Sequence, residues 1–174
     1  MVSLKYRILQ SKSNDSALAE REILQQVAEC ELTPVRVAFF SEVANNEDYL
    51  AQWERIVSLC SDIFGERKPM VVLIAQPPLN ARLLAEVTYV EDDCKIVYNN
   101  DYIVINDCQI FSGGLFLPQD ASIGSKAEKV FERLHEILKT EGFAINDIVR
   151  QWNYIEHITH ISEQGQNYQQ FNDA

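Results

Sequence analysis

The most constraining feature of this sequence is a pair of short, continuous apolar runs on either side of one strong helical pattern. Residues 35–40 follow a proline and are too few for a helix, and Met70 to Ala75 is a second run of the same kind. Between them, Asn45 and Asn46 precede apolar residues at helical spacing that continue to Gly65, a common helix stop. Continuous apolarity indicates burial on both faces of a strand. The pattern therefore predicts a β-α-β unit.

The remaining elements are predicted from the same periodicities and from turn residues between them. They are, in chain order, a strand over residues 1–10, a helix from Asn14–Ser16 to about Cys30, a strand over Leu83–Val90, three short strands of a meander that ends at Phe111, a helix from Ser122 or Ser125 to Gly142, a strand over residues 145–154, and a helix that begins at Tyr168. Strands and helices in this order predict an α+β fold.

Length and charge limit the classes of function. The chain has 174 residues, which suits one domain, so we expect one compact unit. The net charge of −11 would repel phosphate backbones, and the densest basic cluster is only the pair Arg67 and Lys68, which is typical of a solvated turn. We therefore expect no nucleic-acid partner.

The N-terminus and the cysteines give no sign of a membrane, a metal or a cofactor. Residues 1–10 lack the apolar stretch of a signal peptide or membrane span, so we expect a cytoplasmic protein with no membrane partner. Four separated cysteines form no Cys-x-x-Cys pair. His157 and His160 lie near acidic residues, but a surface or capping role is favoured over a metal site.

One candidate ligand-binding group lies in the predicted strand near residue 150. Alternation along a strand puts Arg150, Trp152 and Tyr154 on one face and Gln151 and Asn153 on the other. An arginine between aromatic rings could hold a carboxylate in bidentate fashion. The favoured interpretation is plainer: the arginine stacks on the sheet and pairs with one of the many acidic residues of the chain.

A second candidate group is Ser112 with Gly113 and Gly114, directly after the predicted meander. The glycines permit a backbone geometry or a close approach that side chains would forbid, or they could present N–H groups to an anion. No Gly-x-Ser-x-Gly motif surrounds Ser112, so we do not expect it to be a nucleophile. No catalytic residue is predicted.

Several of these motifs together resemble a known family. The run from Gln109 to Gly114, the helix that ends at Gly142 and Ile148-Val149-Arg150 resemble the RidA/YjgF fold. The segments Arg150–Tyr154 and Tyr168–Asn172 are similar to motifs in the first RidA-like domain of chorismatases. Gln169 stands where those sequences have an arginine, and Ile155 and Glu156 stand where they have a proline. The resemblance covers residues 83–174.

The resemblance implies a fold and a division of the chain. We expect a RidA-like (chorismate mutase-like) mixed sheet with helices packed on one face, formed by residues 83–174 and preceded by a β-α-β extension in residues 1–82. Chorismatases have a second RidA-like domain that carries their catalytic glutamate and substrate-binding arginine. We therefore expect this chain to be a truncated product or a fragment.

The resemblance also implies two functions from different classes. The first is a non-catalytic domain of a chorismatase-like protein, with structural and subunit contacts, a homotrimer as the assembly and a small carboxylate as a ligand. The alternative is a free-standing RidA-type enamine or imine deaminase. Such a deaminase needs a late arginine, and the sequence has no arginine or lysine after Arg150.

Overall fold

The computed structural model describes residues 2–91, 93–116, 121–163 and 165–174. Met1, the first residue of the first predicted strand, lies outside them. The chain divides into two compact units, Met1–Gly114 and Leu115–Ala174, and each is described by itself.

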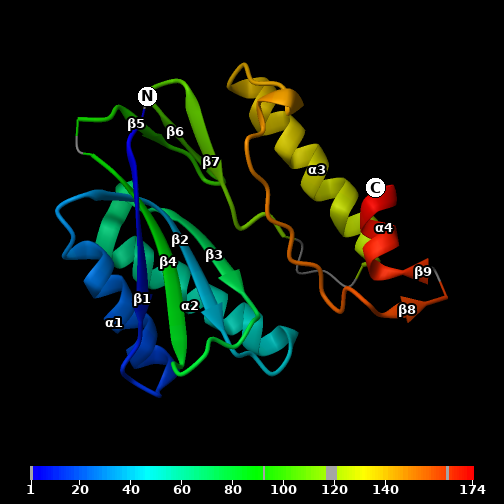
Figure 1. Ribbon diagram of the computed structural model, residues 1–174, viewed down its shortest axis with the longest axis horizontal. Helices are drawn as coiled ribbons and strands as arrows, with labels where there is room; N and C mark the ends of the chain where they lie inside the picture. The colour runs from blue at the N-terminus through cyan, green and yellow to red at the C-terminus, as the bar shows by residue number, and fades with distance from the viewer. Residues whose placement is uncertain (1, 92, 117–120, 164) are drawn as a thin grey trace. The chain divides into compact units, whose positions relative to one another are not determined.

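The first unit is built on a mixed four-stranded sheet with the strand order β1-β4-β2-β3 (Figure 1). β2 and β3 are parallel, as the β-α-β pattern predicts, and β4 is antiparallel to both β1 and β2. The strands are β1 (Leu4–Gln10), β2 (Thr33–Ser41), β3 (Met70–Ile74) and β4 (Leu83–Val90). The mixed sheet confirms the expected α+β class.

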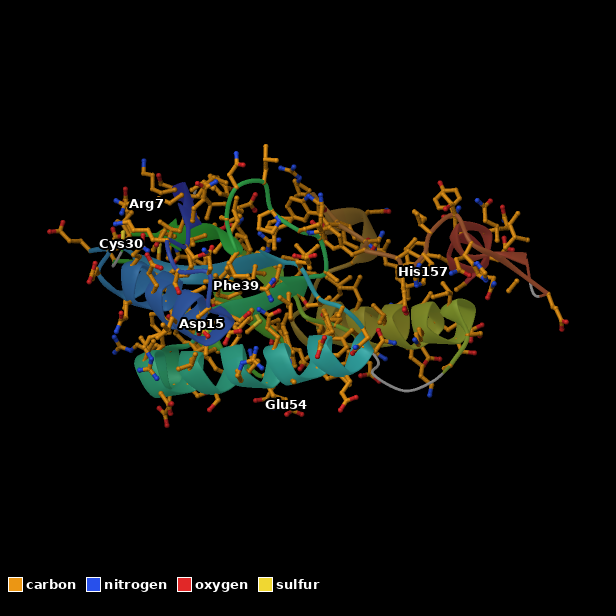
Figure 2. All side chains as sticks on the ribbon, turned by 90° about the horizontal axis from the view of Figure 1, so that it is seen from below. Arg7, Asp15, Cys30, Phe39, Glu54 and His157 are labelled. Atoms are coloured by element: carbon orange, nitrogen blue, oxygen red, sulfur yellow. The ribbon has the colours of Figure 1, made fainter. Side chains whose placement is uncertain are left out.

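Two helices, α1 (Ser16–Ala28) and α2 (Asn46–Phe64), cover one face of this sheet (Figure 2). The Asn45 side chain caps α2 by accepting a hydrogen bond from the backbone N–H of Asp48 at 2.9 Å, and Gly65 ends the helix at a φ of 58°. A short 3₁₀ turn, η1 (Gly65–Arg67), leads into β3.

An ion pair connects α1 to α2. Glu20 is fully buried, and its carboxylate accepts hydrogen bonds from Gln52 at 3.1 Å and from Arg55 at 2.9 and 3.2 Å. These bonds satisfy a charge that burial would otherwise strongly disfavour. On the opposite face of the sheet, Arg36 pairs with Glu86 at 2.8 Å.

A three-stranded antiparallel meander completes the first unit. Asn106 and Asp107, in the turn between its second and third strands, both have positive φ, the geometry of a tight hairpin turn. Its buried residues Ile103 and Ile105 join Val35 and Met70 of the larger sheet in a second apolar cluster. The strands are β5 (Ile96–Tyr98), β6 (Tyr102–Ile105) and β7 (Gln109–Ser112).

The second unit consists of two helices and a connection with little regular structure. Ser122 caps α3, and the rings of Phe131 and Phe171 join α3 to α4 with their centroids 5.5 Å apart. The elements are α3 (Ile123–Thr140), the 3₁₀ turn η2 (Ile145–Asp147), the two-residue strands β8 (Ile161–Ser162) and β9 (Gly165–Gln166), and α4 (Asn167–Asp173).

The predicted strand over residues 145–154 is wrong. Residues 145–147 form the turn η2, and residues 148–154 pair with no described strand. The physical reason is that a strand needs a neighbouring backbone for its hydrogen bonds, whatever its side chains prefer. The predicted boundary after residue 82 falls between elements of one sheet, because β4 pairs with β1 and β2.

None of the helices in the described residues has the length and apolarity needed to cross a membrane.

Candidate functional site

Ser112 is held by a structural hydrogen bond at the end of β7. Its hydroxyl donates to the backbone carbonyl of Asp101 at 3.1 Å, across the hairpin. The side chain is half-buried. This hydrogen bond connects β7 to the β5–β6 turn. A backbone carbonyl cannot deprotonate the Ser112 hydroxyl, so the role of Ser112 is to hold the turn in place.

The two glycines after Ser112 are required by close packing. A Cβ on Gly113 would lie 2.9 Å from Cγ2 of Val72. A Cβ on Gly114 would lie 2.7 Å from the Val71 carbonyl oxygen and 2.8 Å from the Trp53 ring, and Gly114 has a φ of 67°. Of the roles predicted for this pair, close approach and special backbone geometry are the ones that the structure displays.

Gly113 and Gly114 form one wall of a cavity of about 120 Å³ in the first unit. Trp53 and Val57 of α2 and Val71 of β3 provide apolar surface. Its polar lining residues come from two turns and are Lys68, Asn100 and Asp101. The lining therefore combines an aromatic residue with a lysine, an asparagine and an aspartate.

Cys60 of α2 also lines this cavity but is not a reactive thiol. It is fully buried, and burial raises the pKa of the Cys60 thiol to about 12, although the positive charge of Lys68 acts in the opposite direction. The thiolate is the nucleophilic form of cysteine, and it is scarce at neutral pH when the pKa is this high. Cys60 is accordingly part of the cavity surface.

In the second unit, Arg150 lies over the ring of Trp152, with its guanidinium carbon 4.2 Å from the ring centroid. The side chains of Gln151 and Asn153 hydrogen-bond to each other at 2.8 Å. Contacts between residues two apart show that the predicted alternation holds locally, even without a strand partner. Tyr154 is 52% exposed.

The two predicted groups belong to different compact units. Ser112 and Gly113 belong to the first unit, and Arg150, Trp152 and Tyr154 belong to the second. No ion pair links Arg150 to another residue within the described ranges. The favoured prediction of a local acidic partner for Arg150 has no support among these ion pairs.

The histidines lie on the surface. His157, labelled in Figure 2, has a φ of 46° and its ring lies 3.8 Å from the Glu156 carboxylate, while His135 and His160 are exposed. Within the residues that the structure describes, no group of three or more His, Cys, Asp or Glu side chains could hold a metal ion. The surface interpretation of His157 and His160 agrees with this placement.

Sequence reasoning missed Trp53 and Lys68 as cavity residues. Lys68 was assigned to a solvated turn, and Trp53 lies among the apolar residues at helical spacing after Asn46; both interpretations follow from local pattern alone. The available signal was the order of elements: in a β-α-β unit, the turn after the helix returns to the sheet, where Lys68 directly precedes β3.

Comparisons with known proteins bear on the second half of the sequence. A family model described as "Chorismatase FkbO/Hyg5-like, N-terminal" matches residues 86–173, just over half of the chain, and confirms the resemblance stated from the sequence. No curated protein matches.

Among solved structures, Rv2704 from Mycobacterium tuberculosis is similar to this chain. It is described as a member of the YjgF/YER057c/UK114 family, the wider RidA group named above. The identity is 15%, the TM-score is 0.39, and the match covers 52% of this chain and 80% of Rv2704. At this TM-score the likeness carries no argument of its own.

The close contact at Gly114 predicts a large loss of stability on substitution. Gly114→Ala would place a methyl group against the Val71 carbonyl and the Trp53 ring while straining a positive φ. We expect the free energy of unfolding, measured in urea by circular dichroism, to fall by about 3 kcal/mol.

Gly142→Ala is the matched control for the Gly114 substitution. Gly142 has a φ of 76°, and a Cβ there would have no atom within 4 Å. We expect a loss of only about 1 kcal/mol, from backbone strain alone. Equal losses for the two variants would contradict the packing role of Gly114.

Proposed function

Because this chain belongs to the chorismatase FkbO/Hyg5-like family, whose N-terminal domain it matches, we propose that it is a non-catalytic domain that provides subunit contacts in a chorismatase-like protein. The contacts are made by residues 148–154, called here the 148–154 segment. Function of this kind requires an interaction surface rather than an assembled set of catalytic groups.

The observation that carries this proposal is the exposure of large apolar side chains along the 148–154 segment. Val149 is 99% exposed, Trp152 46% and Tyr154 52%. Ile158 and Ile161, a few residues on, are also exposed. Exposed apolar residues that gather in one stretch of a folded chain mark interaction surfaces, because leaving them in water forgoes about 25 cal/mol for each Å² of apolar area.

The backbone of the segment supports the same proposal. Its extended alternation and its β-forming side chains suit a strand, and no described strand pairs with it. An extended segment of this kind can add to the edge of a sheet in another subunit. β1 offers such an edge, since among the described strands only β4 pairs with it, and its side chains Tyr6 and Ile8 are both 63% exposed.

The assembly that we propose is a homotrimer. Each copy carries both a segment that can dock and an edge that can accept it, and these are different surfaces of the chain. Contacts between two different surfaces generate a ring when the rotation closes. The 148–154 segment and the edge of β1 are therefore the two halves of the proposed contact.

A small carboxylate remains the proposed ligand of Arg150. Its guanidinium stacks on Trp152, which orients the fork of N–H donors without neutralising the charge. Ser112 stays outside this proposal, because its hydroxyl already donates to the Asp101 carbonyl in the first unit.

Self-association should depend on Val149. Analytical ultracentrifugation at micromolar concentration is expected to give the mass of a trimer for the native chain and a monomer for Val149→Lys, because a charge replaces an apolar side chain at the contact. Leu79→Lys is the control: Leu79 is 81% exposed, outside the segment, and its loss should leave the trimer intact. A monomeric native chain, or the same change in mass for both variants, would contradict the proposed assembly.

The non-catalytic role predicts that the chain alone does not turn over chorismate. Incubation with chorismate, followed by a lactate dehydrogenase assay for pyruvate, should give a rate equal to that of the buffer blank. A rate that scales with protein concentration would refute the proposal. A rate with an imine substrate, abolished by Arg150→Ala, would instead favour the deaminase alternative.

A further inference from the structure

Tyr89 of β4 has a buried hydroxyl group without a hydrogen-bond partner. The side chain is fully buried in the apolar layer between the sheet and its two helices, and its Oη has no partner among the residues that the structure describes. A buried polar group in this state costs free energy, because it has lost its bonds to water and gained none in return. The Tyr89 hydroxyl is therefore available to any acceptor that forms beside it.

The Cys30 thiol lies beside this hydroxyl. Cys30 belongs to the turn between α1 and β2, is half-buried, and packs against the same apolar layer. Burial is the main cause that raises the pKa of Tyr89 to about 12, and Cys30 is close enough to raise it further. A neutral thiol is only a weak hydrogen-bond partner, so this contact leaves the Tyr89 hydroxyl unsatisfied.

Arg7 of β1, labelled with Cys30 in Figure 2, adds a positive charge to these surroundings. Its guanidinium carbon lies 5.9 Å from the centroid of the Tyr89 ring, and its charge acts to lower the pKa of Tyr89, so its field reaches the hydroxyl. Glu29 and Glu31, the sequence neighbours of Cys30, are exposed, where water and salt screen their charges. An anion at the Cys30 sulfur would thus lie beside a hydrogen-bond donor and within the field of a cation.

A sulfenate is the anion that this arrangement fits. Oxidation of a thiol to this level adds a single oxygen atom to the sulfur, and that oxygen is a hydrogen-bond acceptor. With a pKa of about 12, Tyr89 stays protonated at neutral pH and can donate to it. Because Cys30 is only half-buried, a small oxidant can reach its sulfur, in contrast to the fully buried Cys60.

We propose that Cys30 is a site of reversible oxidation by hydrogen peroxide, and that the Tyr89 hydroxyl stabilises the product by donating a hydrogen bond to the sulfenate oxygen. The Cys30 thiolate attacks one peroxide oxygen, so that an S–O bond forms and the O–O bond breaks. The hydroxide that leaves takes up the proton that the thiol had released, which gives water and the sulfenic acid, the conjugate acid of the sulfenate. The sulfur loses two electrons and the peroxide gains them.

The oxidation is reversed by small thiols. One thiol condenses with the sulfenic acid to give a mixed disulfide and water, and a second thiol releases the Cys30 thiol from that disulfide. This site lies in the first unit and does not depend on the proposed trimer or on Arg150. Its failure would therefore leave the proposed subunit contacts untouched.

The lifetime of the sulfenate tests the role of Tyr89. The full chain is treated with equimolar hydrogen peroxide, the excess is removed with catalase, and dimedone, which labels sulfenic acids, is added after increasing delays. Mass spectrometry then follows the tryptic peptide Glu22–Arg36, in which Cys30 is the one cysteine. The label should persist in the native chain and disappear about tenfold faster in Tyr89→Phe, as expected for the loss of a hydrogen bond to a charged group.

Tyr49→Phe is the matched control. It removes a hydroxyl from the same apolar layer, but one that already donates to the Leu73 carbonyl at 3.0 Å. This variant should keep the native lifetime of the label on Cys30. Absence of label in the native chain, equal lifetimes in the native chain and Tyr89→Phe, or the same shortening in Tyr49→Phe would overturn the proposal.

Discussion

The first unit depends on one apolar layer between the four-stranded sheet and its two helices. Ile23 of α1, Phe39 of β2 and Tyr89 of β4 are all fully buried there. Burying side chains of this size contributes roughly 1.5–3 kcal/mol each before conformational entropy is subtracted. The same layer fixes α2 against β3, and this fixed pair provides the surface against which Gly114 packs. The cavity is thus a consequence of the core.

The strand and helix pattern of the first half could be predicted because each signal was local. The β-α-β unit follows from two apolar runs, and the end of α2 at Gly65 follows from a residue that tolerates a φ of 58°. On α1, the apolar Leu18 is 59% exposed, whereas Ala19 and Ile23 are buried. A shift of one residue turns a helical face by about 100°.

Contacts between sequence neighbours could be predicted for the site residues, whereas contacts between distant elements could not. The alternation of Arg150 with Trp152 is a property of neighbouring residues, and the stacked contact between them confirms it. The strand expected over the same residues required a partner that local sequence cannot supply. Lys68 and Trp53 were missed as lining residues for the same reason, since the cavity that they share exists only after α2 and β3 pack together.

The central claim is that the 148–154 segment is a contact strand between subunits. Hydrogen–deuterium exchange of its backbone amides, followed by mass spectrometry at several protein concentrations, tests this most directly. If the segment docks on another copy, its amides should be protected at high concentration and exchange freely on dilution. Exchange of these amides at one rate, whatever the concentration, would contradict the account.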